Sequence, residues 1–586
     1  MRKVVEVGMH SMRLVVPVLM MSLVVAAVAQ TSSPTATFKS RTDLVLVPVV
    51  VHDKQGKHVS GLSAADFTLQ DDGAKQNLAS VEEVASDSSP AAPPPELAAD
   101  VKRGVLFTNQ VARSSQPKTI LIFAVDLLNA PFVDTEMGRR AMLSFVASHM
   151  SPNVTMGLVT IEPGQVRLLH AFTTSPTVLS AALQKVTAVT STPATQGTLE
   201  AQQTALQDLQ AVTQTEAGTM ANFIAGQRAQ MSQAYLAATA ARNDQNIASA
   251  LEALRQIGAW VAGVPGRKVL VWLTGNIPFI SGQGVMALGK LGVEEYERTM
   301  KALADANVAV YPVDVRGVVP SSMYSARYKD PGMQQQLTMA ESMDGSPSGI
   351  ARRSQSLQVG VVHIEDAHEA MNYIANLTGG RAYYNRNDIP RVLDDAAADS
   401  SRYYMLSYYL DRSHAKPGWH KLKVSVHHQD ATVHARNGFF LDKPAQEGSA
   451  SAKQQDESTA LASPFEYTAL PVNLKWMDTV PRGDKRHVRF EVYIPPSSDL
   501  IGTDRNTLDL DVIATALGGN REVAGQSSKN IKSQLKPQAQ QQIQNFGLTY
   551  VSDLDLKPGE YAVRLVVRDN LTGRLGSVTA PLRVVP

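Results

Sequence analysis

The sequence of 586 residues contains no cysteine. This absence excludes a disulfide framework, thiolate zinc sites, a cysteine nucleophile and a lipid-modified cysteine anchor. The chain also lacks an excess of charge of either sign, because 55 Lys and Arg face 54 Asp and Glu. Such a balance gives no support to nucleic-acid wrapping or to a polybasic membrane binder. We therefore expect no nucleic-acid partner.

Catalytic signatures are lacking as well. The sequence has no Gly-x-Ser-x-Gly elbow, no P-loop and no His-Glu-x-x-His motif, and in 345–349 a proline stands at the nucleophile position. The densest group of possible ligands, 363–368, has its two histidines five positions apart. On a helix these would lie on different faces, so a zinc site is not expected there. The sequence therefore predicts that the protein is not an enzyme.

The N-terminus has the pattern of a secretory signal peptide. Positive residues precede an apolar run over 14–27, and Ala27-Val28-Ala29 supplies the small residues that a signal peptidase requires. A transmembrane anchor is the alternative, but the run is short for a span of about 20 residues. We expect cleavage before Gln30, no transmembrane segment in the mature chain, and export to the periplasm, the cell surface or the medium.

An apolar content of 44% and a charged content of 19% are typical of a globular protein, and the length suggests about three domains. Between 118 and 402, apolar strands alternate with helical stretches, which favours a doubly wound parallel sheet. Shorter alternating strands near the C-terminus favour an Ig-like sandwich. The predicted segments are a signal peptide (1–29), a small N-terminal β module (40–85), a linker and lead-in (86–117), the α/β domain (118–402) with a helical insertion (198–259) and a loop insertion (318–360), a β hairpin extension (403–441), a linker (442–464) and a β-sandwich (465–586).

Several motifs taken together resemble a known family. They are VPVVVHDKQGKHVSGLSAADFTLQDDG, ILIFAVDLLN, VLVWLTGN, AVYPVDVRG, NLTGGRAYYNRND, SSRYYMLSYYL and KLKVSVHHQDATVHARNGFF. In this order and spacing, over roughly 40–440, the chain resembles the VWFA-related domain family common in Acidobacteria, a divergent branch of von Willebrand factor A-like domains. The resemblance implies an α/β fold with a Rossmann-like, doubly wound sheet and a face that binds protein ligands.

The resemblance also implies a site at the carboxyl ends of the strands, where such domains often hold Mg²⁺ or Mn²⁺ on an Asp-x-Ser-x-Ser motif. Here Asp126 matches the first Asp, but Leu128 and Ala130 replace the two serines. Where related domains have Thr-Asp-Gly, this chain has Thr274-Gly275-Asn276.

We therefore expect a degenerate site and no cofactor, with Mg²⁺ or Mn²⁺ on Asp126 as the open alternative. The candidate ligand-binding residues are Asp126, Asn129, Thr274, Asn276 and Asp314. The alternative for the two aspartates is that they cap loops or helices.

The sequence thus favours an exported, non-enzymatic protein of the protein-binding or adhesion type, with one or more protein partners in the cell envelope. A structural or assembly factor of the envelope is the main alternative. An enzyme with an unrecognised site at Asp126 and Asp314 is a third hypothesis. The oligomeric state and the identity of the partner are left open.

Overall fold

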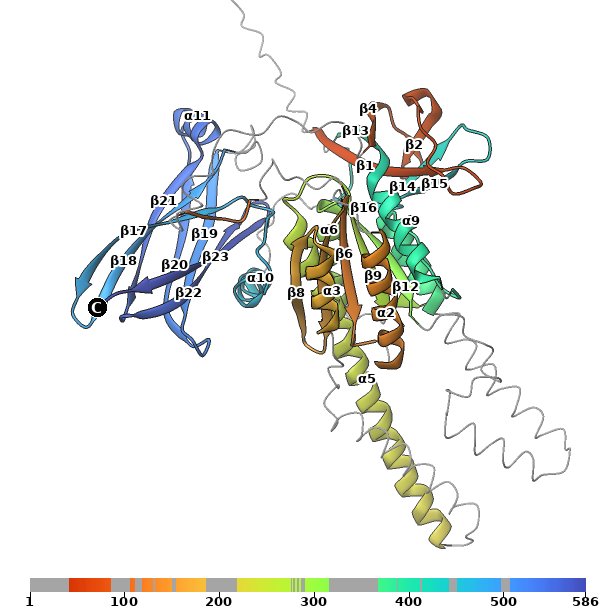
Figure 1. Ribbon diagram of the computed structural model, residues 1–586, viewed down its shortest axis with the longest axis horizontal. Helices are drawn as coiled ribbons and strands as arrows, with labels where there is room; N and C mark the ends of the chain where they lie inside the picture. Colours follow the sequence, from red (N-terminus) through yellow and green to blue (C-terminus); the bar gives the residue numbers. More distant parts are fainter. Residues whose placement is uncertain are drawn as a thin grey trace, which may run out of the picture.

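The computed structural model describes most of the chain from residue 42 onward (Figure 1). The described residues are 42–85, 106–110, 119–129, 132–149, 154–185, 219–275, 277, 280–281, 284–285, 290–315, 367–386, 388–411, 414–441, 450–496 and 506–586. The predicted signal peptide, the predicted loop insertion and the first part of the helical insertion (198–218) lie outside these residues. No described helix combines the length and the apolar character that crossing a membrane would require.

The chain is a mixed α/β protein that consists mostly of β-sheet, so the predicted fold class is wrong. We expected an α/β chain dominated by a Rossmann-like, doubly wound sheet of the von Willebrand factor A type. Of the six sheets that the described residues form, one contains parallel strand pairs and the others are antiparallel. The prediction gave too much weight to the middle of the chain, where strands and helices alternate. The strands on both sides of it pair antiparallel.

The sheet with parallel pairs lies at the centre of the molecule and has the strand order β12-β9-β6-β7-β8. Its strands are β6 (Thr119–Asp126), β7 (Val154–Glu162), β8 (Gln165–Thr173), β9 (Lys268–Thr274) and β12 (Val308–Asp314). Strand β8 runs antiparallel to β7, and the other neighbours are parallel. Every residue of β6 and β9 is buried, which explains their almost continuous apolar sequences.

Helices cover both faces of this central sheet. One face of β6, including Ile120 and Ile122, packs against α5, α6 and a helix over 367–378. The other, including Leu121 and Phe123, packs against α2, α3 and α9. The helices are α2 (Phe132–His149), α3 (Pro176–Gln184), α5 (Thr219–Val261), α6 (Lys290–Asp305) and α9 (Ile389–Ser401), and a short hairpin of β10 (Ile280–Ser281) and β11 (Gly284–Val285) precedes α6.

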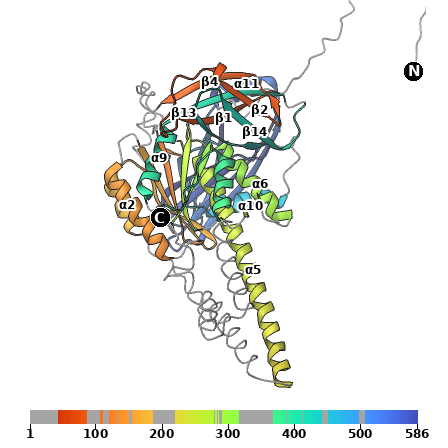
Figure 2. The same cartoon turned by 90° about the vertical axis from the view of Figure 1, so that its right-hand side faces the viewer.

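Two features of these helices follow from the sequence. The Ala/Gln-rich stretch predicted as helical forms most of α5, whose N-terminal part projects from the body of the molecule (Figure 2). The helix over 367–378 ends at Gly379, with a φ of +77° that suits glycine.

The segments predicted as a separate N-terminal module (40–85) and a hairpin extension (403–441) form one β unit. One sheet has the order β15-β1-β13-β4 and the other the order β16-β14-β2-β3. The elements are β1 (Thr42–His52), η1 (Ala64–Asp66), β2 (Phe67–Asp71), β3 (Ala74–Lys75), β4 (Leu78–Ala85), β13 (Arg402–Asp411), β14 (Gly418–Val426), β15 (Thr432–Ala435) and β16 (Gly438–Leu441). Alternate side chains of β1, such as Val45 and Val47, fill the core between the two sheets.

A buried polar network joins this β unit to the central sheet. Asp399 on α9 lies 2.9 Å from the ring of His52 on β1 and 3.0 Å from Arg381. Tyr311 of β12 donates a hydrogen bond of 2.7 Å to the same carboxylate. Through His52 the network joins the β unit to the central sheet at the amino ends of the parallel strands. The arrowhead of β6 points away from it in Figure 1.

The C-terminal part is a sandwich of two four-stranded antiparallel sheets around a shared apolar core. One sheet contains β5 (Leu106–Thr108), β17 (Asn473–Arg482), β18 (Lys485–Ile494) and β21 (Leu548–Leu556). The other contains β19 (Thr507–Leu517), β20 (Val523–Gln534), β22 (Gly559–Asp569) and β23 (Leu575–Val584). Helix α11 (Pro537–Phe546) lies between β20 and β21 in the sequence. Strand β5 lies inside the predicted linker 86–117 and pairs with β17. That linker therefore supplies a strand to a domain some 360 residues further along, at Asn473.

Helix α10 (Ala450–Ala462) lies inside the second predicted linker and connects the sandwich to the central sheet. Its Asp456 is buried and pairs with Arg255 of α5 at 2.8 Å, with Arg298 of α6, and with Arg568 of β22 at 3.3 Å. One carboxylate thus binds three guanidinium groups from three elements. The second linker is therefore a structural joint between the two parts.

Candidate functional sites

The carboxyl edge of the central sheet brings together four of the five predicted site residues, Asp126, Asn129, Thr274 and Asp314. Asp126, Thr274 and Asp314 are the last residues of β6, β9 and β12. In the parallel register Asp314 lies opposite Thr274, and Val125 lies opposite Leu273 one residue earlier. Carboxyl ends of parallel strands are where ligands bind in open α/β sheets. Asn129 follows β6 closely, whereas Asn276 lies outside the described residues.

Asp126 is fully buried and is surrounded by hydrogen-bond donors. Its Oδ1 accepts bonds of 2.9 Å from the backbone N–H groups of Leu128 and Asn129. Its Oδ2 accepts bonds from the Asn129 amide at 3.0 Å, the Trp272 indole at 3.2 Å and the Thr274 hydroxyl at 2.7 Å. Five donors therefore occupy the two carboxylate oxygens.

This environment decides what Asp126 can do. Burial raises the pKa of Asp126, and the hydroxyl, amide and backbone donors oppose that shift. A metal ion at this carboxylate would have to displace donors that would then be left buried and unpaired. The geometry thus supports the alternative in which Asp126 holds a loop, because two of its bonds fix the turn of residues 127–129.

Asp314 has a different partner, which the sequence prediction did not include. Its carboxylate lies 3.0 Å from Nε2 of His368, at the start of the helix over 367–378. The His368 ring stacks on Tyr384, with ring centres 4.1 Å apart. The contact with Asp314 orients the imidazole of His368. His368 belongs to the 363–368 group considered for zinc, but its spacing in sequence gave no signal that it meets Asp314.

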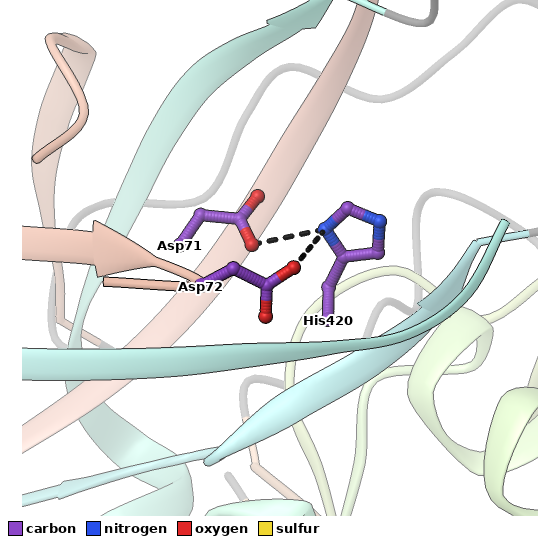
Figure 3. Close-up of side chains that lie close together, drawn as sticks. All are labelled: Asp71, Asp72 and His420. Atoms are coloured by element: carbon purple, nitrogen blue, oxygen red, sulfur yellow. Dashed lines mark hydrogen bonds and ion pairs between the residues drawn. The ribbon is translucent and has the colours of Figure 1, made fainter. Parts of the chain in front are cut away.

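A second group of titratable side chains lies in the β unit, and the site prediction missed it. Asp71 ends β2, Asp72 follows it in a tight turn, and His420 lies on β14. Both carboxylates point at the same ring nitrogen of His420 (Figure 3). Of the described His, Cys, Asp and Glu side chains, this is the group close enough to share one metal ion. In the sequence Asp71-Asp72-Gly73 signals only a turn, and 349 positions separate Asp71 from His420.

Comparisons with known proteins do not assign a family. No family model matches the chain, and a search of curated proteins gives no significant match. Among solved structures, it is similar to a Bacteroides uniformis β-glucuronidase with 12% identity over 31% of this chain and 19% of that chain, at a TM-score of 0.13. It is similar to the pilus adhesin SpaC from Lactobacillus rhamnosus GG with 9% identity over 80% of this chain and 54% of that chain, at a TM-score of 0.21. TM-scores this low carry no argument about fold or function.

Proposed function

We propose that the protein is an exported, non-enzymatic protein that binds another protein through its β unit. The observation that carries this proposal is an exposed apolar strip on β1 and β13, formed by Leu44, Leu46 and Tyr409. Their exposed fractions are 52%, 48% and 64%. Export rests on the signal-peptide pattern of residues 1–29.

The strip results from the alternation of side chains along the strand. Val45 and Val47 of β1 face the core of the β unit, so Leu44 and Leu46 face outward. Leu44 lies directly opposite Tyr409 in the antiparallel pair, which makes the apolar surface continuous across the two strands. A solvated strand face ordinarily carries polar residues. Adjacent exposed large apolar side chains favour a protein-interaction surface.

The backbone under the strip is fixed, which favours a preformed surface. Arg436 donates a hydrogen bond of 2.7 Å to the carbonyl of Leu46. Ser80 of β4 and Ser407 of β13 share a hydrogen bond of 2.7 Å beside it. A surface that needs no ordering on binding loses less entropy when a partner docks.

Site-specific photo-crosslinking in the producing cell tests this proposal. A photoreactive amino acid replaces Leu46, and the matched control carries it at Val480 on β17 of the sandwich, where the exposed fraction is 46% against 48%. We expect a discrete crosslinked protein with the probe at position 46 and none at position 480. The variant Leu46→Asp should then abolish binding of that purified partner, whereas Val480→Asp should not.

Two results would contradict the proposal. Equal crosslinking at both positions would mean that the strip is not a specific surface. The absence of any crosslink at position 46, with the variant folded and exported, would mean that the strip has no protein partner.

A further inference from the structure

We propose that Asp71, Asp72 and His420 form a binding site for a first-row divalent metal ion such as Zn²⁺. The three ligand atoms would be Oδ1 of Asp71, Oδ2 of Asp72 and Nδ1 of His420. This metal site lies in the β unit, away from the carboxyl edge of the central sheet, and the inference does not depend on the proposed partner surface.

The spacing of the ligand atoms fits a single cation. Nδ1 of His420 lies 3.0 Å from Oδ1 of Asp71 and 3.5 Å from Oδ2 of Asp72. Two ligand atoms about 2.1 Å from one metal ion lie about 3.0 Å apart at a right angle and about 3.4 Å apart at the tetrahedral angle. The two distances from Nδ1 to the carboxylate oxygens, drawn as dashed lines in Figure 3, are therefore those of neighbouring ligands in one coordination sphere.

The remaining polar atom of each ligand is held from outside the site. The Nε2–H of His420 donates to the carbonyl of Lys416 at 2.8 Å, so Nδ1 is the ring nitrogen that faces the carboxylates, 3.0 Å from Oδ1 of Asp71. Tyr408 donates to Oδ2 of Asp71 at 2.8 Å, and the backbone N–H of Lys421 donates to Oδ1 of Asp72 at 2.9 Å. Metal-binding histidines and carboxylates are characteristically oriented by bonds of this kind from their second polar atom.

Two of the three ligand side chains are buried and the third is exposed, which suits a metal ion with coordination positions open to solvent. The side chains of Asp71 and His420 are only 4% and 6% exposed, whereas that of Asp72 is 57% exposed. The His420 ring is stacked on Phe439, with ring centres 5.0 Å apart. Two rigid ligands thus lie inside and one lies at the surface. Water or an oxygen ligand from a partner could complete the coordination from the solvent side.

A proton on Nδ1 of His420 would compete with a metal ion for the place between the two carboxylates. Burial lowers the pKa of His420, but the Lys416 carbonyl and the Asp71 carboxylate outweigh it and raise the pKa above its ordinary 6.5. Both occupants satisfy the same requirement, a positive charge at Nδ1 between two carboxylates. A divalent ion supplies one charge more than a proton, and it has to displace that proton to bind.

Isothermal titration of the purified chain with Zn²⁺ at pH 7.5 in a non-chelating buffer tests the proposal. We compare the wild type with Asp72→Asn, which removes a ligand charge at an exposed position, and with His420→Gln. The matched control is His428→Gln, because His428 is an exposed histidine of the same β unit. Circular dichroism and melting curves in EDTA establish that each variant is folded.

The wild type and His428→Gln are expected to bind one equivalent of Zn²⁺ and to melt at a higher temperature than in EDTA. Asp72→Asn should bind at least tenfold more weakly, and His420→Gln should lose the binding. Substitution of Co²⁺ for Zn²⁺ should give visible absorption bands that are absent in His420→Gln. The absence of a saturable site in the folded wild type, or equal binding by all variants, would overturn the proposal and leave a proton as the occupant of Nδ1.

Discussion

The carboxyl edge of the central sheet and the β unit both hold buried aspartates, yet their surroundings are opposite. At the edge, five donors converge on Asp126 and use up its oxygens. In the β unit, each of Asp71 and Asp72 has one oxygen held by a donor and the other directed at the ring of His420. A carboxylate whose donors come from the backbone and neutral side chains holds structure, whereas carboxylates that converge on one exchangeable proton can accept a cation in its place.

The largest expected loss of stability comes from removing Asp126, the carboxylate that its five donors enclose; we call this group the closed site. Asp126→Ala leaves two backbone N–H groups, an indole and an amide without their acceptor inside the protein. We expect the free energy of unfolding to fall by about 3–5 kcal/mol, since one buried donor left without an acceptor costs about 1–3 kcal/mol and several are left here. Urea denaturation followed by fluorescence measures this, with the exposed Asp484→Ala as control. A loss below about 1 kcal/mol would mean that the donors find other acceptors, against the closed-site interpretation.

A smaller effect is expected when the corresponding buried aspartate of the β unit is removed. In EDTA, Asp71→Ala should lower the free energy of unfolding by about 1–3 kcal/mol. The loss is smaller than for Asp126 because His420 can give up its proton and so avoid an unpaired buried charge. The same urea denaturation compares the two variants. If Asp71→Ala destabilises more than Asp126→Ala, the two regions do not differ in the way described.

The smallest effect is expected for Asp72→Asn in EDTA. Its side chain is 57% exposed, and exposed ion pairs contribute about 0–1 kcal/mol. We expect the free energy of unfolding to change by less than about 0.5 kcal/mol, whereas zinc binding weakens strongly. A loss above about 1 kcal/mol without metal would mean that Asp72 has a structural role, against the account of an exposed ligand.

The sequence was sufficient for features that depend on near neighbours. The apolar runs at 119–126 and 268–274 form buried strands, and Gly379 ends its helix. The fold class was wrong because it depends on which strands pair. Nothing in Thr42–His52 indicates that β1 pairs with β13, more than 350 residues later. Likewise, 106–108 resembled a linker because three residues carry too little pattern to predict a strand.

The candidate sites were predictable to a similar degree. Asp126 and Thr274 were singled out because the family resemblance implies a site at these positions, and Asp314 because it ends an apolar strand. That His368 meets Asp314, and that Trp272 donates to Asp126, depends on side-chain directions at one edge of the sheet. Asp71, Asp72 and His420 come together only through the antiparallel pairing of β2 with β14, which no local motif encodes.

Locating a bound metal tests the contrast between the two regions most directly. Crystals grown with Zn²⁺ would be measured at wavelengths above and below the zinc absorption edge. We predict an anomalous peak between Asp71, Asp72 and His420, and none within bonding distance of Asp126. A peak on Asp126 at the carboxyl edge, or no ordered zinc at the three residues of the β unit, would contradict the account.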